Sequence, residues 1–260
     1  MKSLWSVFDR KPAPPLPVVR QHLAAAAWPA VVYAVGDVHG CADLLASLMD
    51  RIVADARDIE GERWLVMLGD YVDRGPDSAR VLDMLLSPPP AGFRRFNLAG
   101  NHEVMMLAFL DNPETNPQWL DYGGREALAS YGLSSDAMST MTPAALGREL
   151  AQRLPVEHLE LLRSLPLSLS LPGTVFVHAG IRRGVPMPEQ IEADVLWIRR
   201  AFHDADPVDD LLVVHGHTPG PVPVVEPRRI CIDTGAYATG RLTAFRLSTG
   251  SPPVLMSTAD

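Results

Sequence analysis

The sequence predicts a mixed α/β fold, and three observations predict it. Short apolar runs recur along the 260 residues, and the segments between them carry helical patterns. The run Trp-Leu-Val-Met-Leu at 64–68 is apolar throughout, which is typical of a strand buried on both faces of a parallel sheet. With 47% hydrophobic and 21% charged residues, the chain can bury a large core. We expect one domain with appendages.

Seven apolar runs are the predicted strands. They cover residues 31–38, 64–68, 93–98, 174–177, 211–214, 229–232 and 242–247. Residues 1–30 include Lys-Pro-Ala-Pro-Pro-Leu-Pro, and because prolines remove donors from a β-ladder, we expect a tail or a strap across the surface. Residues 250–260 are similar, so the folded core is expected over residues 31–249.

Helical patterns fill the gaps between these runs. Leu44, Leu48 and Ile52 recur at helical spacing. Pro76 suits the first turn of the next helix, and three consecutive prolines end that helix. The stretch at about 112–170 is longer than one crossover helix requires, so we interpret it as helices inserted into the α/β core. We expect this insert to cover one side of the site.

Charge and cysteine content narrow the class of protein. The net charge is −8 and there is no block rich in Lys or Arg, so the sequence predicts no binding to nucleic acid or to an anionic membrane. Cys41 and Cys231 cannot build a disulfide framework, which fits a reducing compartment. No run reaches the roughly 18 apolar residues of a membrane helix. We expect a soluble protein of the cytoplasm.

Five strand ends carry residues that can do chemistry. They read Gly-Asp-Val-His-Gly at 36–40, Gly-Asp-Tyr-Val-Asp-Arg-Gly at 69–75, Gly-Asn-His-Glu at 100–103, Val-His-Ala-Gly at 177–180 and His-Gly-His-Thr at 215–218. Ligands collect beyond the carboxyl ends of strands in open α/β sheets. Carboxylates neutralise and bridge cations, and imidazoles suit Mn, Fe or Zn. The inventory predicts a two-metal site.

These motifs, in this order and at this spacing, resemble those of the calcineurin-like metallophosphoesterases, and within them the bacterial and phage form of the phosphoprotein phosphatases. The resemblance covers roughly residues 31–240 and is specific, because the first three motifs and the later His-Ala-Gly and Gly-His are all present. It implies two mixed β-sheets packed face to face as a sandwich flanked by helices. The catalytic domain would cover residues 31–249, with the helical insert inside it.

The resemblance also assigns ligands to two divalent metal ions. Asp37 and His39 would bind the first ion and Asp70 would bridge both. The second ion would be bound by Asn101, His178 and His217. A hydroxide between the ions would attack phosphorus in line, without a phosphoenzyme. Mn²⁺ is the first choice for both ions, with Fe or Zn as alternatives, because availability as well as affinity decides occupancy.

Four further residues take roles by the same resemblance. His102 would protonate the leaving oxygen as the general acid, and Asp73 would orient it and keep it cationic. Arg74 would hold the phosphoryl oxygens with its planar guanidinium group. Arg199, which follows Trp197 by two residues, is the preferred second arginine, and Arg200 is its alternative.

The expected activity is hydrolysis of phosphomonoesters, with phosphoserine and phosphothreonine in proteins or peptides as first substrates and small phosphate esters as others. One alternative is a symmetrical dinucleoside polyphosphate hydrolase. That branch shares most ligands, but it usually lacks an aspartate equivalent to Asp73 and has Asp where this chain has Glu103. Another alternative is a catalytically silent, metal-binding regulatory module, against which the retained His102 and Arg74 count.

Four histidines lie outside these roles. His215 stands two residues before His217, and we interpret it as a strand-end residue and not as a ligand. His22, His158 and His203 match no motif, and we expect them on the solvated surface.

Overall fold

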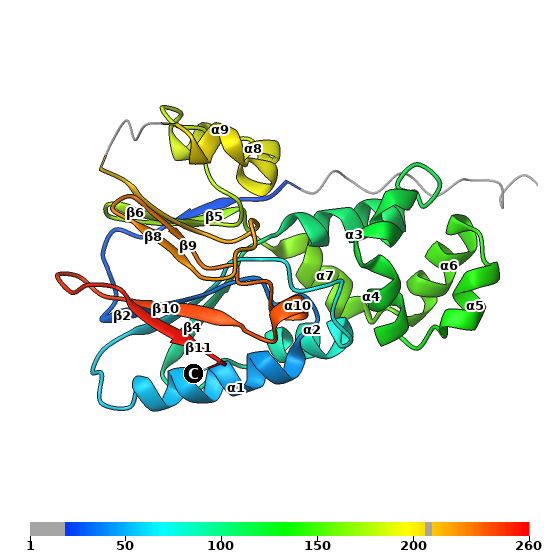
Figure 1. Cartoon of the computed structure of the whole chain (residues 1–260), viewed down its shortest axis with the longest axis horizontal. Coiled ribbons are helices and arrows are strands. Elements are labelled where there is room, and N and C mark those ends of the chain that lie inside the picture. The colour runs from blue at the N-terminus through cyan, green and yellow to red at the C-terminus, as the bar shows by residue number, and fades with distance from the viewer. Residues whose placement is uncertain (1–18, 206–209, 260) are drawn as a thin grey trace, which may run out of the picture.

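Two β-sheets packed face to face form the centre of the structure (Figure 1), a computed structural model that describes residues 19–205 and 210–259. The proline-rich part of the expected N-terminal tail lies outside the described residues. Both sheets contain parallel and antiparallel pairs. The predicted sandwich of two mixed sheets is therefore confirmed.

The six-stranded sheet has the order β1-β5-β6-β7-β9-β8. Its strands are β1 (His22–Ala24), β5 (Ser168–Leu171), β6 (Thr174–Val177), β7 (Leu212–His215), β8 (Val224–Glu226) and β9 (Arg229–Cys231). Strands β6, β7 and β9 run parallel to one another. The loops that follow these three strands therefore leave the sheet at the same edge.

The five-stranded sheet has the order β11-β10-β2-β3-β4. Its strands are β2 (Val31–Val35), β3 (Arg63–Met67), β4 (Phe93–Asn97), β10 (Thr243–Leu247) and β11 (Val254–Ser257). Strands β2, β3 and β4 are parallel, and Val35, Met67 and Asn97 are aligned across them. The loops after these strands consequently start side by side.

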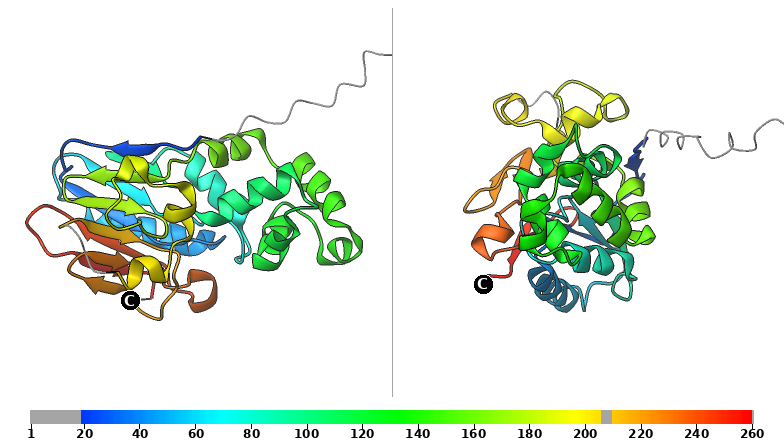
Figure 2. Two further views of the ribbon diagram at one scale, coloured as in Figure 1. Left: turned by 90° about the horizontal axis from the view of Figure 1, so that it is seen from above. Right: turned by 90° about the vertical axis from the view of Figure 1, so that its right-hand side faces the viewer.

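Helices cover the outer faces of both sheets and one end of the sandwich (Figures 1 and 2). In Figure 1, α1 (Ala42–Asp55) lies below the five-stranded sheet and α2 (Ser78–Leu86) lies to the right of it. Above the six-stranded sheet lie α8 (Glu192–Trp197) and α9 (Arg200–His203). The short segments η2 (Met187–Glu189) and α10 (Ala236–Thr239) precede α8 and follow β9. None of the helices among the described residues is long and apolar enough to cross a membrane.

The helical insert lies beyond one end of the sandwich, with α3 leading into it (Figure 2). These helices are α3 (Asn101–Asp111), η1 (Pro117–Tyr122), α4 (Gly124–Ser130), α5 (Ser135–Thr140), α6 (Pro143–Arg153) and α7 (Val156–Ser164). The expected insert at about 112–170 also contained the start of β5, which belongs to the six-stranded sheet.

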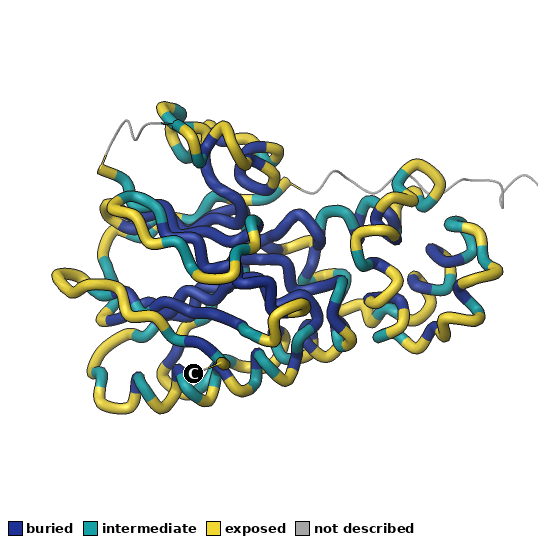
Figure 3. The backbone as a smooth tube through the Cα atoms, viewed as in Figure 1, coloured by how far each residue is buried: buried dark blue, intermediate teal, exposed yellow. Residues whose placement is uncertain are grey.

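The core follows the alternation of side chains along the strands. Val32 and Ala34 of β2 pack between the two sheets, while Val31, Tyr33 and Val35 pack towards the helices. Figure 3 shows the buried backbone concentrated in the two sheets and at their junction with α3. The loops that follow the parallel strands thus start from the most buried part of the molecule.

The expected tails are partly strands. His22–Ala24 pair in parallel with β5, and Val254–Ser257 pair antiparallel with β10. Both segments are edge strands of three and four residues, so each has a hydrogen-bonding partner on one side only. The sheet thus extends beyond the core expected over residues 31–249.

The expectation of a solvated surface was wrong for His158 and incomplete for His22 and His203. His158 is buried, with one ring nitrogen 2.8 Å from the Tyr131 hydroxyl and the other 3.0 Å from Asp83. Two polar partners offset its burial. His22 and His203 are half-buried.

Candidate active site

Apart from Arg199, which follows α8, the predicted site residues follow the carboxyl ends of the parallel strands of both sheets. In the five-stranded sheet they follow β2, β3 and β4, and in the six-stranded sheet they follow β6 and β7. Apart from Arg74 they are at most 5% exposed. The set consists of Asp37, His39, Asp70, Asp73, Arg74, Asn101, His102, His178 and His217.

Strained backbone is concentrated in the same loops. In the described part of the chain, five residues other than glycine have positive φ, between 44° and 73°, and all five belong to the site. Such a conformation costs roughly 1–3 kcal/mol per residue and persists only where the surroundings enforce it. The five residues are His39, Asp70, Asp73, Arg74 and His217.

Glu103 fixes the loop that carries three of these strained residues. Its side chain is fully buried and accepts hydrogen bonds from the backbone N–H groups of Asp70, Tyr71, Val72 and Gly100, at 2.7–3.2 Å. Burial raises the pKa of Glu103 to about 7, and the backbone donors oppose this rise because they stabilise the carboxylate. The motif at residues 100–103 therefore holds the loop at residues 69–75 in place.

Glycine is required where two site loops touch. A Cβ atom at Gly216 would lie 1.9 Å from Asp37 Oδ1, and one at Gly75 would lie 2.1 Å from the His39 carbonyl oxygen. Either contact is far inside van der Waals distance. The glycines of the motifs therefore permit the close approach of loops that come from different strands.

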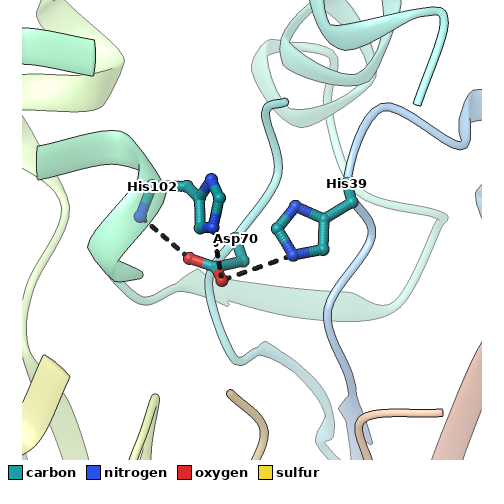
Figure 4. A group of neighbouring side chains, drawn as sticks. All are labelled: His39, Asp70 and His102. Carbon is teal, nitrogen blue, oxygen red and sulfur yellow. Dashed lines mark hydrogen bonds and ion pairs between the residues drawn. The ribbon is translucent and has the colours of Figure 1, made fainter. Parts of the chain in front are cut away.

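A first group of possible metal ligands consists of His39, Asp70 and His102, with one ligand atom of each within 4.8 Å of the others (Figure 4). His39 Nδ1–H donates to the Val72 carbonyl at 2.9 Å, which leaves its Nε2 lone pair facing Asp70 Oδ2 at 3.5 Å. The backbone N–H of His102, at the N-terminus of α3, donates to Asp70 Oδ1 at 3.0 Å.

A second group consists of Asp70, His178 and His217, and Asn101 joins it. Asn101 Oδ1 lies 2.9 Å from both His178 Nε2 and His217 Nδ1. His178 Nε2 also lies 3.4 Å from Asp70 Oδ1, while its Nδ1–H donates to the Leu68 carbonyl. Asp70 is therefore shared by the two groups of possible ligands.

Asp37 belongs to neither of these groups, although it lies beside them. Its Oδ2 accepts the backbone N–H of His217 at 3.0 Å. Burial and the nearby Asp233 and Asp70 raise its pKa well above the usual range. Asp233, which follows β9, is itself buried and was not predicted; its place after a strand end was the available signal.

These residues fit divalent cations. Asp37 Oδ1 and His39 Nε2 are buried and make no hydrogen bond to the described residues. Burial lowers the pKa of His178 to about 4 and that of His217 to about 2, so these imidazoles are neutral, the form that binds metal. Positive ions would also offset the clustering of buried carboxylates.

A chain of hydrogen bonds runs through His102. Its Nδ1 lies 2.7 Å from Asp73 Oδ2, and Trp119 Nε1–H donates to the same oxygen at 2.8 Å. All three side chains are at most 2% exposed. Burial raises the pKa of Asp73, and the Trp119 hydrogen bond and Arg74 oppose that rise. Sequence reasoning did not assign Trp119, because the insert brings it to Asp73 from 46 residues away.

Two arginines lie beside the two groups of possible metal ligands. Arg74 Nη2 lies 3.0 Å from His102 Nε2, and its guanidinium group lies 4.9 Å above the Tyr237 ring. Arg199 Nε lies 3.1 Å from His217 Nε2. Arg200 is exposed at the start of α9 and does not line the neighbouring cavity. One arginine therefore stands beside each metal-ligand group.

A cavity of about 680 Å³ opens beside the centre. At its polar end lie Arg74, Asn101, His102 and Arg199. Its remaining walls come from α3, the segment that ends in η1, and the end of α8; they are lined by Val104, Met105, Ala108, Asn116, Gln118, Trp119, Tyr122 and Trp197. The insert thus covers one side of the site, as expected.

His215 gives a pH-dependent prediction. It is fully buried at the end of β7, and burial lowers its pKa to about 3. The unfolded chain would bind a proton here below about pH 6.5 and the folded chain only near pH 3. The free energy of unfolding should therefore decrease as the pH falls from about 6.5 towards 3, by at most about 1.4 kcal/mol per pH unit.

Replacing His215 by phenylalanine should remove this contribution. In urea unfolding of the metal-free protein between pH 6.5 and pH 4, the free energy of unfolding of His215→Phe should fall less steeply than that of the wild type, by up to that slope. Parallel pH profiles for the two proteins would contradict the assignment of a neutral, buried His215.

The fold and the site define a class, the metallophosphoesterases, which are hydrolases with a dinuclear divalent metal centre. The sequence profile of calcineurin-like phosphoesterases matches residues 30–248. The chain belongs to this family, as its motifs predicted.

Two proteins with related sequences are named bis(5'-nucleosyl)-tetraphosphatases. The chain is 29% identical over 232 residues to bis(5'-nucleosyl)-tetraphosphatase PrpE (asymmetrical) of Halalkalibacterium halodurans, which covers 82% of this chain and 88% of the relative. The protein of the same name from Bacillus subtilis is 26% identical, with the same coverage.

Two solved structures share the fold. A candidate diadenosine tetraphosphatase superposes with a TM-score of 0.60 at 20% identity, covering 92% of this chain and 98% of the other. The cold-active protein-tyrosine phosphatase of a psychrophilic Shewanella superposes with a TM-score of 0.59 at 18% identity, covering 92% and 82%. At these identities the likeness concerns the fold.

Proposed function

We propose that this metallophosphoesterase hydrolyses dinucleoside polyphosphates at a phosphoanhydride bond. The observation that carries the proposal is the cavity beside the centre, which is lined by arginines and His102 at one end and by aromatic and apolar side chains beyond them. A phosphate chain attached to a nucleoside has the same division into an anionic and a flat apolar part. The names of the related sequences support this substrate class.

The proposal replaces the first expectation from the sequence, a serine/threonine protein phosphatase. Asp73 and Glu103 had counted against a dinucleotide hydrolase, yet the relatives support the dinucleotide alternative better. The name of these relatives specifies asymmetrical cleavage, whereas the alternative from the sequence was a symmetrical hydrolase. We therefore propose that diadenosine tetraphosphate would yield AMP and ATP instead of two molecules of ADP.

We propose that Asp37, His39, Asp70, Asn101, His178 and His217 hold two divalent cations. Mn²⁺ is the first choice and Fe or Zn are alternatives, because these metals accept imidazole and carboxylate ligands. The cations would supply activation of water and neutralisation of phosphate charge.

Side chains of the protein bind the phosphate and donate the proton. Arg74 and Arg199, one beside each ligand group, bind phosphoryl oxygens. As the oxygen of water bonds to phosphorus and releases a proton to solvent, the bond from phosphorus to the leaving oxygen breaks and the electron pair stays on that leaving oxygen. His102 delivers a proton to it, and Asp73 compensates the charge of the protonated imidazole.

Phosphomonoester hydrolysis is the second candidate, and the chain from Trp119 through Asp73 to His102 favours it. An alkoxide leaving group is strongly basic and needs a proton, whereas a polyphosphate leaves as a stable anion. A complete proton-donating arrangement is therefore more useful to a monoesterase.

A substrate comparison tests the proposal. Metal-stripped protein would be reloaded with Mn²⁺ and given diadenosine tetraphosphate and a phosphothreonine peptide side by side, with products separated by chromatography. We expect a higher kcat/KM for the dinucleotide, with AMP and ATP as products. A preference for the peptide would make the protein a phosphomonoesterase, and ADP as the single product would make the cleavage symmetrical.

Replacing Trp119 by phenylalanine should lower kcat by roughly 5- to 10-fold, because Asp73 loses about 1–1.5 kcal/mol of hydrogen-bond stabilisation. The pH profile of kcat should move as well, since that hydrogen bond lowers the pKa of Asp73. Trp28→Phe, which removes an indole hydrogen bond to Pro172 outside the site, is the control. Unchanged kcat and pH profile in Trp119→Phe would show that Trp119 only packs.

A further inference from the structure

Trp197 and Tyr122 are large aromatic side chains left in contact with solvent at the cavity. Trp197, the last residue of α8, is 45% exposed, and Tyr122, at the end of η1, is 56% exposed. Other large rings in the described part of the chain, such as those of Trp119 and Phe109, are fully buried, and Tyr237 is 42% exposed. Exposed aromatic surface that lines a concave site is available to a ligand.

Trp197 is also close to the metal-ligand groups. Its ring lies 6.3 Å from the ring of His217 at an angle of 82°, and Arg199 contacts the same histidine. A ligand whose phosphates reach Arg199 would therefore bring its next atoms to Trp197.

The chemistry of the walls away from the centre fits a neutral, flat group. Among residues 19–205 and 210–259, Arg74 and Arg199 are the only Lys, Arg, Asp or Glu residues that line the cavity. The exposed Gln118 amide makes no hydrogen bond to the described residues, whereas the Asn116 amide donates to the Ala108 and Asn112 carbonyls. A nucleobase has a π-face for Trp197 and a polar edge for Gln118.

The size of the cavity agrees with this occupant. Its volume of about 680 Å³ is in the range of sites for small molecules, roughly 300–1,000 Å³, and leaves room for a nucleoside. A peptide backbone would find few free hydrogen-bonding groups there, because the lining away from the centre is mainly apolar.

We propose that this cavity is the binding subsite for one nucleobase of the substrate, and that Trp197 stacks on it. The inference rests on the proposed function, because it places one nucleoside of a dinucleoside polyphosphate beside the arginines. Trp197 determines specificity and does not touch the reacting atoms, so it acts on binding more than on kcat.

Binding of AMP and of ribose 5-phosphate to the Mn²⁺-loaded protein, measured by calorimetry, tests the subsite without turnover. We expect the wild type to bind AMP more tightly than ribose 5-phosphate. Trp197→Ala should weaken the binding of AMP roughly 10-fold or more and have little effect on the binding of ribose 5-phosphate. Trp197→Phe should restore most of the affinity. Ile191→Ala, which removes an exposed side chain at the other end of α8 and outside the cavity, is the matched control.

Activity separates this inference from the proposed function. In the expected case, Trp197→Ala raises the KM for diadenosine tetraphosphate about 10-fold and leaves kcat within about twofold. If the wild type binds AMP no better than ribose 5-phosphate, or Trp197→Ala binds AMP like the wild type, the subsite is refuted whatever the activity. If AMP binding depends on Trp197 but the dinucleotide is not hydrolysed, the subsite stands and the proposed function fails.

Discussion

Replacing His102 by alanine should lower kcat/KM for phenyl phosphate by ~100-fold or more and leave the bound metal unchanged. The expected reason is the loss of the proton donor, since His102 Nδ1 is held by Asp73 and its Nε2 faces Arg74 at the cavity. The loss should be smaller for p-nitrophenyl phosphate, whose leaving group needs less protonation, and smallest for diadenosine tetraphosphate, which releases a polyphosphate.

Metal analysis of the same variant tests a different role for His102. Its Nε2 lies 3.9 Å from Asp70 Oδ2, so the geometry also permits His102 to be a metal ligand. If His102→Ala lost metal together with activity, or lost the same factor on all three substrates, the role of general acid would be wrong. His203→Ala, at a half-buried histidine outside the site, controls for the loss of an imidazole.

The central strands were predictable because their buried position in the fold requires a distinctive, apolar composition. Residues 31–35 and 64–67 are buried between helices on one face and a second sheet on the other, which requires apolar side chains. Strands β1 and β11 lie at sheet edges and are three and four residues long. Runs this short carry no distinctive pattern, and the tertiary partner decides their conformation.

The candidate ligands could be picked out because their motifs resemble those of a known family. Each motif also follows a predicted strand, and neighbouring parallel strands bring their carboxyl ends together. Asp233 obeys the same rule after β9, so the signal existed. Trp119 had none, because its contact with Asp73 depends on how the insert folds back over the loop at 69–75.

His158 illustrates what a single residue type cannot reveal. A histidine that follows a glutamate near the start of a helix resembles a solvated side chain, yet α7 packs against α2 and buries His158. Its partners, Tyr131 and Asp83, are 27 and 75 residues away. Long-range pairs of this kind make burial of a polar group possible, and local sequence does not encode them.

Replacing Asp70 by asparagine should lower kcat by ~10³-fold, which corresponds to roughly 4 kcal/mol of lost stabilisation by metal. Asp70 reaches both ligand groups, with Oδ2 3.5 Å from His39 Nε2 and Oδ1 3.4 Å from His178 Nε2. Asparagine keeps the shape, accepts the His102 backbone N–H and tolerates the positive φ of 51° at this position, but it removes the negative charge between the two cations. Metal per chain should fall below that of the wild type.

Without metal, Asp70→Asn should be at least as stable as the wild type. Burial raises the pKa of Asp70 to about 6, so above that pH the folded, metal-free wild type carries a buried charge that the unfolded chain keeps in water, and its stability falls as the pH rises through 6. Asp70→Asn avoids this loss and should unfold in EDTA at pH 8 at the same or a higher temperature. Asp43→Asn, at an exposed aspartate paired with Arg80, should change neither property. Full metal content with kcat within tenfold of the wild type would exclude Asp70 as the bridging ligand. A large loss of stability in EDTA would mean that its carboxylate holds the fold instead of the metals.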